Sequence, residues 1–178
     1  LRTEQEIALK WVFAGWAVLL AAITFAPPLQ VNLLCAALIA GFGGVPVVWS
    51  GDEFGMANDP HWADEPGHED DNRWVHRARM DWELAARRHT PGSVESRVFH
   101  GIAHLARTRA RLPHLHASVA SVVLGVWDPG VLVLARRHPT GTMLAVYNVT
   151  DSWRPLPGWV LRQERLAEAT EALSGARV

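Results

Sequence analysis

The stretch that decides the fold runs from Gly43 to Gly55 and reads GGVPVVWSGDEFG. Its apolar centre, Val45 to Trp49, is entered through glycine and proline and left through a Ser-Gly-Asp-Glu turn. A short, continuously apolar run of this kind is typical of a β-strand that is buried on both faces. Ligands of α/β proteins bind beyond the carboxyl ends of such strands. The polar and aromatic residues from Met56 to Arg79 therefore predict part of a ligand site.

The residues before this stretch predict helices. Val31 to Gly44 carries alanine and leucine on every face and ends in glycines, which indicates a buried helix with a left-handed stop. Further upstream, Trp11 to Leu29 is almost wholly apolar and nearly reaches the length of a membrane span before two prolines break it. We interpret this run as a helix buried in a larger protein. A membrane anchor and a segment foreign to the fold are the alternatives, because hydropathy alone does not separate them.

The residues after the stretch predict a long loop and then one helix. From Asn58 to Arg88 no period of 2 or 3.6 persists, and a loop of this length inside a compact chain is usually functional. Thr90 as N-cap and Pro91 at the first helical position then predict a helix that Pro113 ends.

The remainder of the chain predicts an antiparallel β module. Three runs rich in β-branched residues are separated by two turn sequences at hairpin spacing, DPG from Asp128 and HPTG from His138. The runs are residues 119–127, 131–137 and 142–149. Trp159 to Leu161 is interpreted as a further strand, and no obvious closing element follows it.

Bulk properties limit the class of protein. The chain has 178 residues, a formal net charge of −1 and a pI near 6.8, which gives no general reason to expect a nucleic-acid partner. Its single cysteine, Cys35, lies in an apolar run and forms no internal disulfide, so we expect a buried thiol in a reducing, cytoplasmic compartment.

Three segments in order resemble one enzyme family. They read GVPVVWSGDEFGMAND from Gly44, DDNRWVHRARMDW from Asp70 and VFHGIAHLARTR from Val98. Together they resemble amylosucrases and the closely similar sucrose hydrolases of the α-amylase superfamily of glycoside hydrolases. The resemblance covers roughly Leu33 to the C-terminus. Its glycine-rich strand is shared by the whole superfamily, whereas the DNRWVHR segment is specific to the sucrose-acting branch.

The resemblance implies an α/β fold plus an all-β domain. The chain would carry the last βα unit of a (β/α)₈ TIM barrel, followed by an antiparallel β-sandwich domain. The domains expected are an apolar N-terminal segment of uncertain origin (1–30), the C-terminal part of the barrel with its long active-site loop (31–115), and the C-terminal β domain (116–178). Residues 1–30 do not read like the barrel segments expected before the strand.

The chemistry implied is retaining transfer of a glucosyl unit from sucrose. A carboxylate nucleophile forms a glucosyl-enzyme, a carboxylic acid protonates the departing fructose, and an α-glucan acceptor or water completes the turnover. In the family these groups lie on earlier barrel strands, so we assign no catalytic residue in this chain and expect it to be inactive alone. The partners expected are sucrose, an α-glucan acceptor and the remainder of the barrel, without a cofactor, nucleic acid or membrane.

Arg73 is the substrate-binding residue that the resemblance singles out. It corresponds to the arginine that closes the bottom of the glucose pocket, where a planar guanidinium can hold a carboxylate and sugar hydroxyls together. The alternative is a loop arginine in a surface ion pair. The residues expected to support the loop are Asp52, Glu53, Asp71, Trp74, His76 and Arg77.

Four further interpretations stay open. The acidic, histidine-bearing residues 61–71 have irregular ligand spacing, so we favour a solvated loop over a metal site. Another α-glucosidase of the superfamily, or a trehalose synthase-like enzyme, is an alternative activity. A carbohydrate-binding β module would need a line of exposed aromatic side chains on one sheet face, and a membrane-tethered fragment would depend on Trp11 to Leu29.

Overall fold

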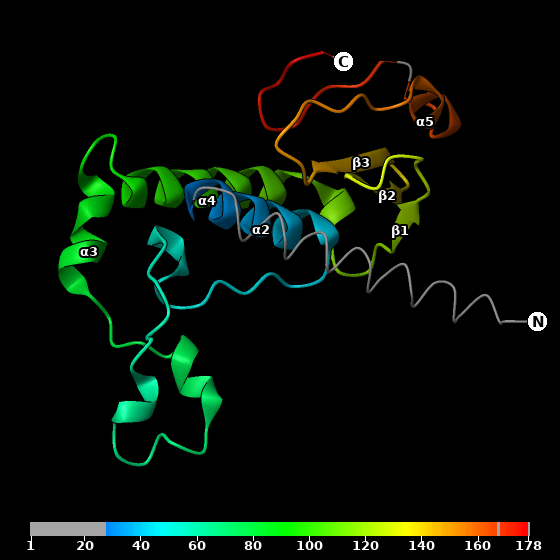
Figure 1. Cartoon of the computed structure of the whole chain (residues 1–178). Coiled ribbons are helices and arrows are strands. Elements are labelled where there is room, and N and C mark those ends of the chain that lie inside the picture. Colours follow the sequence, from blue (N-terminus) through cyan, green and yellow to red (C-terminus); the bar gives the residue numbers. More distant parts are fainter. Residues whose placement is uncertain (1–27, 167, 178) are drawn as a thin grey trace, which may run out of the picture. The chain divides into compact units, whose positions relative to one another are not determined.

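Strand β2 (Val131–His138) is the centre of the only sheet in the described part of the chain (Figure 1). The structure is a computed structural model that describes residues 28–166 and 168–177. Strands β1 (Ser121–Leu124) and β3 (Gly141–Asn148) flank β2, and both pair with it in antiparallel fashion. The predicted antiparallel β module is therefore confirmed.

The described chain divides into two compact units, and each is described by itself. The sheet unit combines the described residues up to Pro46 with those from Leu105 onward. The loop unit runs from Val47 to His104. The expected domain boundaries at residues 30 and 115 stay predictions.

Both hairpin turns form as their sequences predict. In the first, the Gly130 amide donates to Asp128 Oδ1 at 2.8 Å and the Val131 amide donates to the Asp128 carbonyl at 3.2 Å. In the second, His138 pairs with Gly141 at the end of the β2–β3 ladder, and Gly141 has a φ of 140°, which favours glycine. Turn chemistry thus sets the register of the meander.

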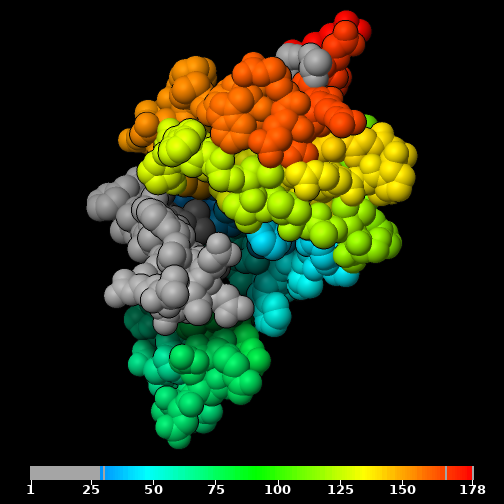
Figure 2. Space-filling view, turned by 90° about the vertical axis from the view of Figure 1, so that its right-hand side faces the viewer, coloured from blue at the N-terminus to red at the C-terminus, as the bar shows by residue number. Residues whose placement is uncertain are grey.

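One face of β2 builds the hydrophobic core. Val131, Val133 and Ala135 pack with Leu124 of β1 and with Val160 of helix α5 (Gly158–Gln163). Val133, Ala135 and Val160 are completely buried. In Figure 2 the orange surface around α5 lies against the yellow-green surface of the sheet. At the end of this face, Arg137 makes a two-pronged ion pair with the buried carboxylate of Glu164, at 2.9 and 2.5 Å.

The opposite face of β2 carries a buried arginine. Arg136 is 1% exposed, and its guanidinium donates to the carbonyls of Phe42 (2.8 Å), His114 (2.6 Å), His116 (2.8 Å) and Val119 (2.6 Å). A fifth bond goes to the Ser121 hydroxyl of β1. Burial, and then the nearby charge of Arg109, lowers the pKa of Arg136. The carbonyl oxygens and the hydroxyl together accept the N–H donors of a guanidinium that is removed from water.

Helix α2 (Pro28–Phe42) packs against this arginine through its C-terminus. It ends where predicted, because Gly43 and Gly44 take φ values of 111° and 72°. A Cβ at Gly43 would lie 1.9 Å from a nitrogen of Arg136, so this glycine also leaves room for the guanidinium. Arg109 donates to the carbonyls of Ala40 and Gly44, which places a second cation at the negative end of the helix.

Helix α2 also meets β3 directly. The Tyr147 hydroxyl donates to the Ala37 carbonyl at 3.3 Å, and burial raises the pKa of Tyr147 to about 12. A Cβ on Gly41 would lie 1.9 Å from the Tyr147 hydroxyl oxygen. The glycine therefore allows the close approach of helix and strand.

The loop unit consists of short helical turns and the first part of one long helix. Its α-helices are α3 (Trp82–Ala86) and α4 (Val94–Arg111), of which α4 continues into the sheet unit. Its 3-10 turns are Asp52–Phe54, Trp62–Asp64, Asn72–His76 and Arg87–His89. A further 3-10 turn, Pro113–Leu115, follows α4 in the sheet unit.

The predicted buried strand Val45–Trp49 is wrong. The segment is not part of a sheet, and its side chains at Val45, Val47, Val48 and Trp49 are 81%, 70%, 53% and 52% exposed. A strand requires a neighbour to complete its hydrogen-bond ladder, and no strand pairs with these residues in the described structure. The apolar run fits a strand only where such neighbours exist.

Two further element predictions need correction. Trp159 to Leu161 lies inside α5 and is not a strand, because its residues bury Val160 against the sheet with helical spacing. Helix α4 begins at Val94 and not at Thr90, because Gly92 has a φ of 82° and the Ser93 hydroxyl accepts from the Ser96 amide at 3.0 Å. Ser93 therefore takes the capping role expected of Thr90.

The described residues form one three-stranded antiparallel sheet, with helix α5 packed on one face of β2. This agrees with the expected C-terminal β domain. The β-sandwich and the barrel unit stay predictions. None of the helices in the described residues is long and apolar enough to cross a membrane, and most of Trp11–Leu29 lies outside these residues.

Replacing Arg136 tests its structural role. We expect Arg136→Met to lower the free energy of unfolding by about 3 kcal/mol, because five hydrogen bonds from a buried side chain are lost. Urea unfolding followed by circular dichroism measures this change. Arg107→Met, at an exposed position of α4, is the control and should shift stability by no more than about 0.5 kcal/mol. Equal effects of the two substitutions would contradict the role.

Candidate functional site

Arg73 lies at the start of the 3-10 turn Asn72–His76 and is held by Asp71. The Asp71 carboxylate accepts from the Arg73 amide at 3.0 Å, from Nε at 2.7 Å and from a terminal nitrogen at 2.8 Å. These bonds with Arg73 lower the pKa of Asp71 to about 2. The Arg73 side chain is 71% exposed, so the guanidinium is oriented by its neighbour and still open to solvent.

The Trp74 ring packs against other side chains of the loop unit. The His68 ring lies parallel to it, with ring centroids 3.8 Å apart and an interplanar angle of 8°. The guanidinium carbon of Arg77 lies 5.2 Å from the Trp74 ring centroid, in the range of a cation–π contact. Trp74, His68 and Arg77 therefore tie two parts of the loop unit together.

A hollow of about 260 Å³ lies beside this stack. Its lining combines the aromatic stack with two carboxylates and two guanidinium groups: Asp59, Glu65, His68, Trp74, Arg77 and Arg79. Arg79 pairs with Glu65 at 3.3 Å across it. Arg73 is not among the lining residues, so the structure does not bring Arg73 and the hollow together.

The remaining support residues bind backbone or side-chain partners within the loop unit. Asp52 Oδ2 accepts from the Trp49 amide at 3.3 Å, and Glu53 Oε2 accepts from the Gly51 amide at 2.8 Å. His76 Nδ1 lies 3.2 Å from Asn58 Oδ1, across 18 residues of sequence. Asp52 and Glu53 thus fix the turn after residue 49, and His76 fixes the far end of the loop.

The acidic, histidine-bearing segment 61–71 makes short-range ion pairs. His61 lies 3.1 Å from Asp64, and His68 lies 3.9 Å from Glu65. Among the described residues, no group of three or more His, Cys, Asp or Glu side chains could hold a metal ion.

Sequence reasoning missed a larger hollow in the sheet unit. It has a volume of about 530 Å³ and a mostly apolar lining from α2, the end of α4, β3 and the residues after Leu156. His114 borders it, and burial followed by the charge of His138 lowers the pKa of His114. No local sequence signal could have located this hollow, because four segments far apart in sequence form its walls.

The Asp71–Arg73 pair can be tested by titration. Because the pKa of Asp71 is lowered, the carboxylate should stay ionised and paired until the pH falls to about 2. We expect Arg73→Ala to raise the Asp71 titration midpoint toward its ordinary value of 3.8. Carboxyl carbon shifts followed by NMR against pH measure the midpoint. Arg79→Ala, which removes the partner of Glu65, should leave it unchanged; an unperturbed midpoint before substitution would contradict the pairing.

Comparison with known families identifies the C-terminal part of the chain. Residues 121–178 match the family model described as "Amylosucrase, C-terminal domain". The match begins at the first residue of β1 and includes the three strands, α5 and the residues that follow them. This match supports the resemblance drawn from the sequence for the C-terminal part of the chain, which is similar to the C-terminal domain of amylosucrases.

Proposed function

We propose that the chain is the C-terminal part of a retaining enzyme that transfers the glucosyl unit of sucrose to an α-glucan or to water and releases fructose. The observation that carries the proposal is the family match of residues 121–178. The three segments that resemble sucrose-acting enzymes precede or adjoin it in the expected order.

The exposed segment Val45–Trp49 favours an interaction with a further part of the enzyme. Four large apolar side chains that are each more than half exposed lie within five residues, and contiguous apolar exposure of this kind marks an interaction surface. The segment also lies outside any sheet of the described residues, whereas a barrel strand has a paired strand on each side. The remainder of the catalytic barrel is the partner that fits both properties.

Arg73 is the residue proposed to meet the substrate. An arginine has five N–H donors on its side chain, and the pair with Asp71 uses two of them. Three donors remain outside the pair, arranged in a fixed plane, and sugar hydroxyls are suitable acceptors. Asp71 would then orient the guanidinium, while Asp52, Glu53, Trp74, His76 and Arg77 hold the loop that carries it.

Sucrose turnover by the complete enzyme tests the proposed activity. We expect the 178-residue chain alone to release neither glucose nor fructose from sucrose, and the product of the reading frame extended upstream to release fructose. A coupled fructose assay measures both. Turnover by the chain alone, or a complete enzyme that cleaves maltose and leaves sucrose intact, would contradict the proposal.

The role of Arg73 is tested in the complete enzyme. We expect Arg73→Ala to lower kcat/KM for sucrose by roughly a hundredfold while the fold is retained, because the substrate loses a positioning group. Arg73→Lys keeps the charge without the planar fork and should recover only part of the loss. Arg97→Ala, at an exposed position of α4 in the same unit, is the control. An unchanged kcat/KM in Arg73→Ala would remove Arg73 from the pocket.

A further inference from the structure

Two tryptophans are the most exposed large apolar side chains of the described residues. Trp127 is 91% exposed and Trp153 is 84% exposed. Exposed apolar side chains of this size are unfavourable in water and mark binding surfaces when they occur together. Trp127 precedes the β1–β2 turn, and Trp153 lies in the segment after β3.

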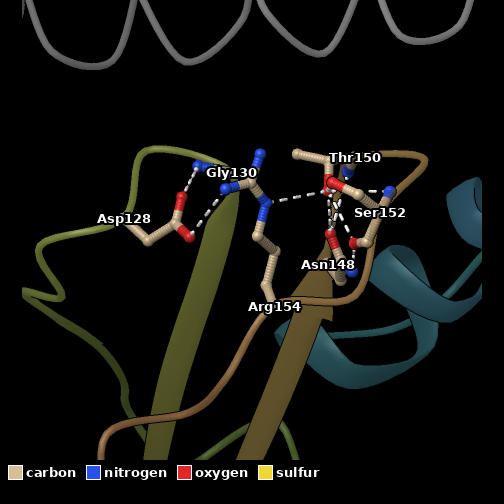
Figure 3. Close-up of polar contacts among 6 residues, drawn as sticks. All are labelled: Asp128, Gly130, Asn148, Thr150, Ser152 and Arg154. Carbon is tan, nitrogen blue, oxygen red and sulfur yellow. Dashed lines mark hydrogen bonds and ion pairs between the residues drawn. The ribbon is translucent and has the colours of Figure 1, made fainter.

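The structure brings the two segments to one end of the sheet. Val131 and Asn148 pair at the last position of the β2–β3 ladder, and the Val149 amide donates to the Gly130 carbonyl at 2.9 Å. Arg154 then reaches Asp128 at 3.6 Å. Figure 3 shows Asp128 and Gly130 on one side of this contact and the polar residues after β3 on the other. Each tryptophan is the direct neighbour in sequence of one member of the ion pair.

The polar residues at the end of β3 and after it form a hydrogen-bonded turn. The Thr150 hydroxyl donates to Asn148 Oδ1 at 2.7 Å, and the Asn148 side-chain amide donates to the Ser152 carbonyl at 2.7 Å. Arg154 Nε donates to the Thr150 hydroxyl at 3.3 Å. A Cβ on Gly130 would lie 2.4 Å from the Thr150 methyl group, so the two turns are packed closely. The surface is therefore organised before any ligand binds.

We infer that Trp127 and Trp153, with the polar residues that adjoin them in the two segments, form a non-catalytic binding site for a neutral α-glucan chain. Indole rings offer flat apolar faces on which the apolar face of a pyranose ring can stack. The side chains of Asp128, Asn148, Thr150 and Arg154 supply the donors and acceptors that sugar hydroxyls require. The choice of α-glucan as the polysaccharide rests on the proposed function.

The charges at the site favour a neutral ligand. Asp128 and Arg154 offset one another, and the exposed Asp151 adds one carboxylate. A surface with one guanidinium and two carboxylates does not attract phosphates, which makes nucleic acid a poor ligand. Two exposed indole rings with polar groups near them suit a polysaccharide, because its pyranose rings carry both apolar faces and hydroxyl groups.

Retardation of the 178-residue chain in native gels containing glycogen tests this site. We expect glycogen to slow the chain, and Trp127→Ala and Trp153→Ala each to weaken the apparent affinity about tenfold. The double variant should migrate as it does without glycogen. Trp127→Phe keeps an aromatic face and should retain part of the binding. Because both side chains lie in solvent, circular dichroism should show the same fold and melting temperature in all variants.

Controls separate this site from other sources of binding. Trp82→Ala replaces a tryptophan of the loop unit that is 74% exposed, and it should leave the retardation unchanged. Absence of retardation by glycogen, retention of binding in the double variant, or stronger retardation by heparin than by glycogen would overturn the inference. The assay needs no sucrose turnover, so its outcome is independent of the sucrose assay on the complete enzyme.

Discussion

The sheet unit depends on one buried cation. The hydrogen bonds of the Arg136 guanidinium go to four backbone carbonyls and one hydroxyl, whose dipoles offset its charge. These acceptors come from the end of α2, from the residues after α4 and from β1, so a single side chain of β2 connects three segments that are distant in sequence. A lysine could not replace it, because three donors on a point charge do not reach five acceptors. Gly43 then becomes obligatory, since any side chain there would displace the guanidinium.

Much of the fold could be predicted from local signals. The DPG and HPTG turns located the β2 and β3 ends, and the glycines after Phe42 located the end of α2, because both depend on backbone preferences that act over a few residues. The failures have tertiary causes. Val45–Trp49 reads as a strand, yet a strand needs neighbours that the described residues do not supply. Trp159–Leu161 reads equally as strand or helix, and only its packing on the sheet selects α5. At the start of α4, Gly92 and Ser93 compete with Thr90 and Pro91, and Ser93 becomes the N-cap.

The candidate site also combines contacts that the sequence predicts with contacts that depend on the tertiary fold. Asp71 and Arg73 are two residues apart, so their pairing is within the reach of sequence reasoning, whereas the stack of Trp74 on His68 requires the loop to fold back on itself. Among the aromatic residues of the C-terminal part, Tyr147 is buried and Trp159 packs on the core, while Trp127 and Trp153 remain in solvent. The segments that carry Trp127 and Trp153 lie at one end of the sheet because of the β2–β3 register, which no spacing in the sequence reveals.

The central claim is that this chain completes a sucrose-acting barrel whose catalytic groups lie before it. The match of residues 121–178 to the amylosucrase C-terminal domain and the exposed apolar side chains of Val45–Trp49 both support that claim. The most direct measurement is the nucleotide sequence upstream of the codon for Leu1. The account predicts an open frame that continues into the preceding barrel strands and encodes the carboxylate nucleophile and the carboxylic acid that protonates the departing fructose. A stop codon immediately upstream, or an open frame without those two carboxylates, would contradict it.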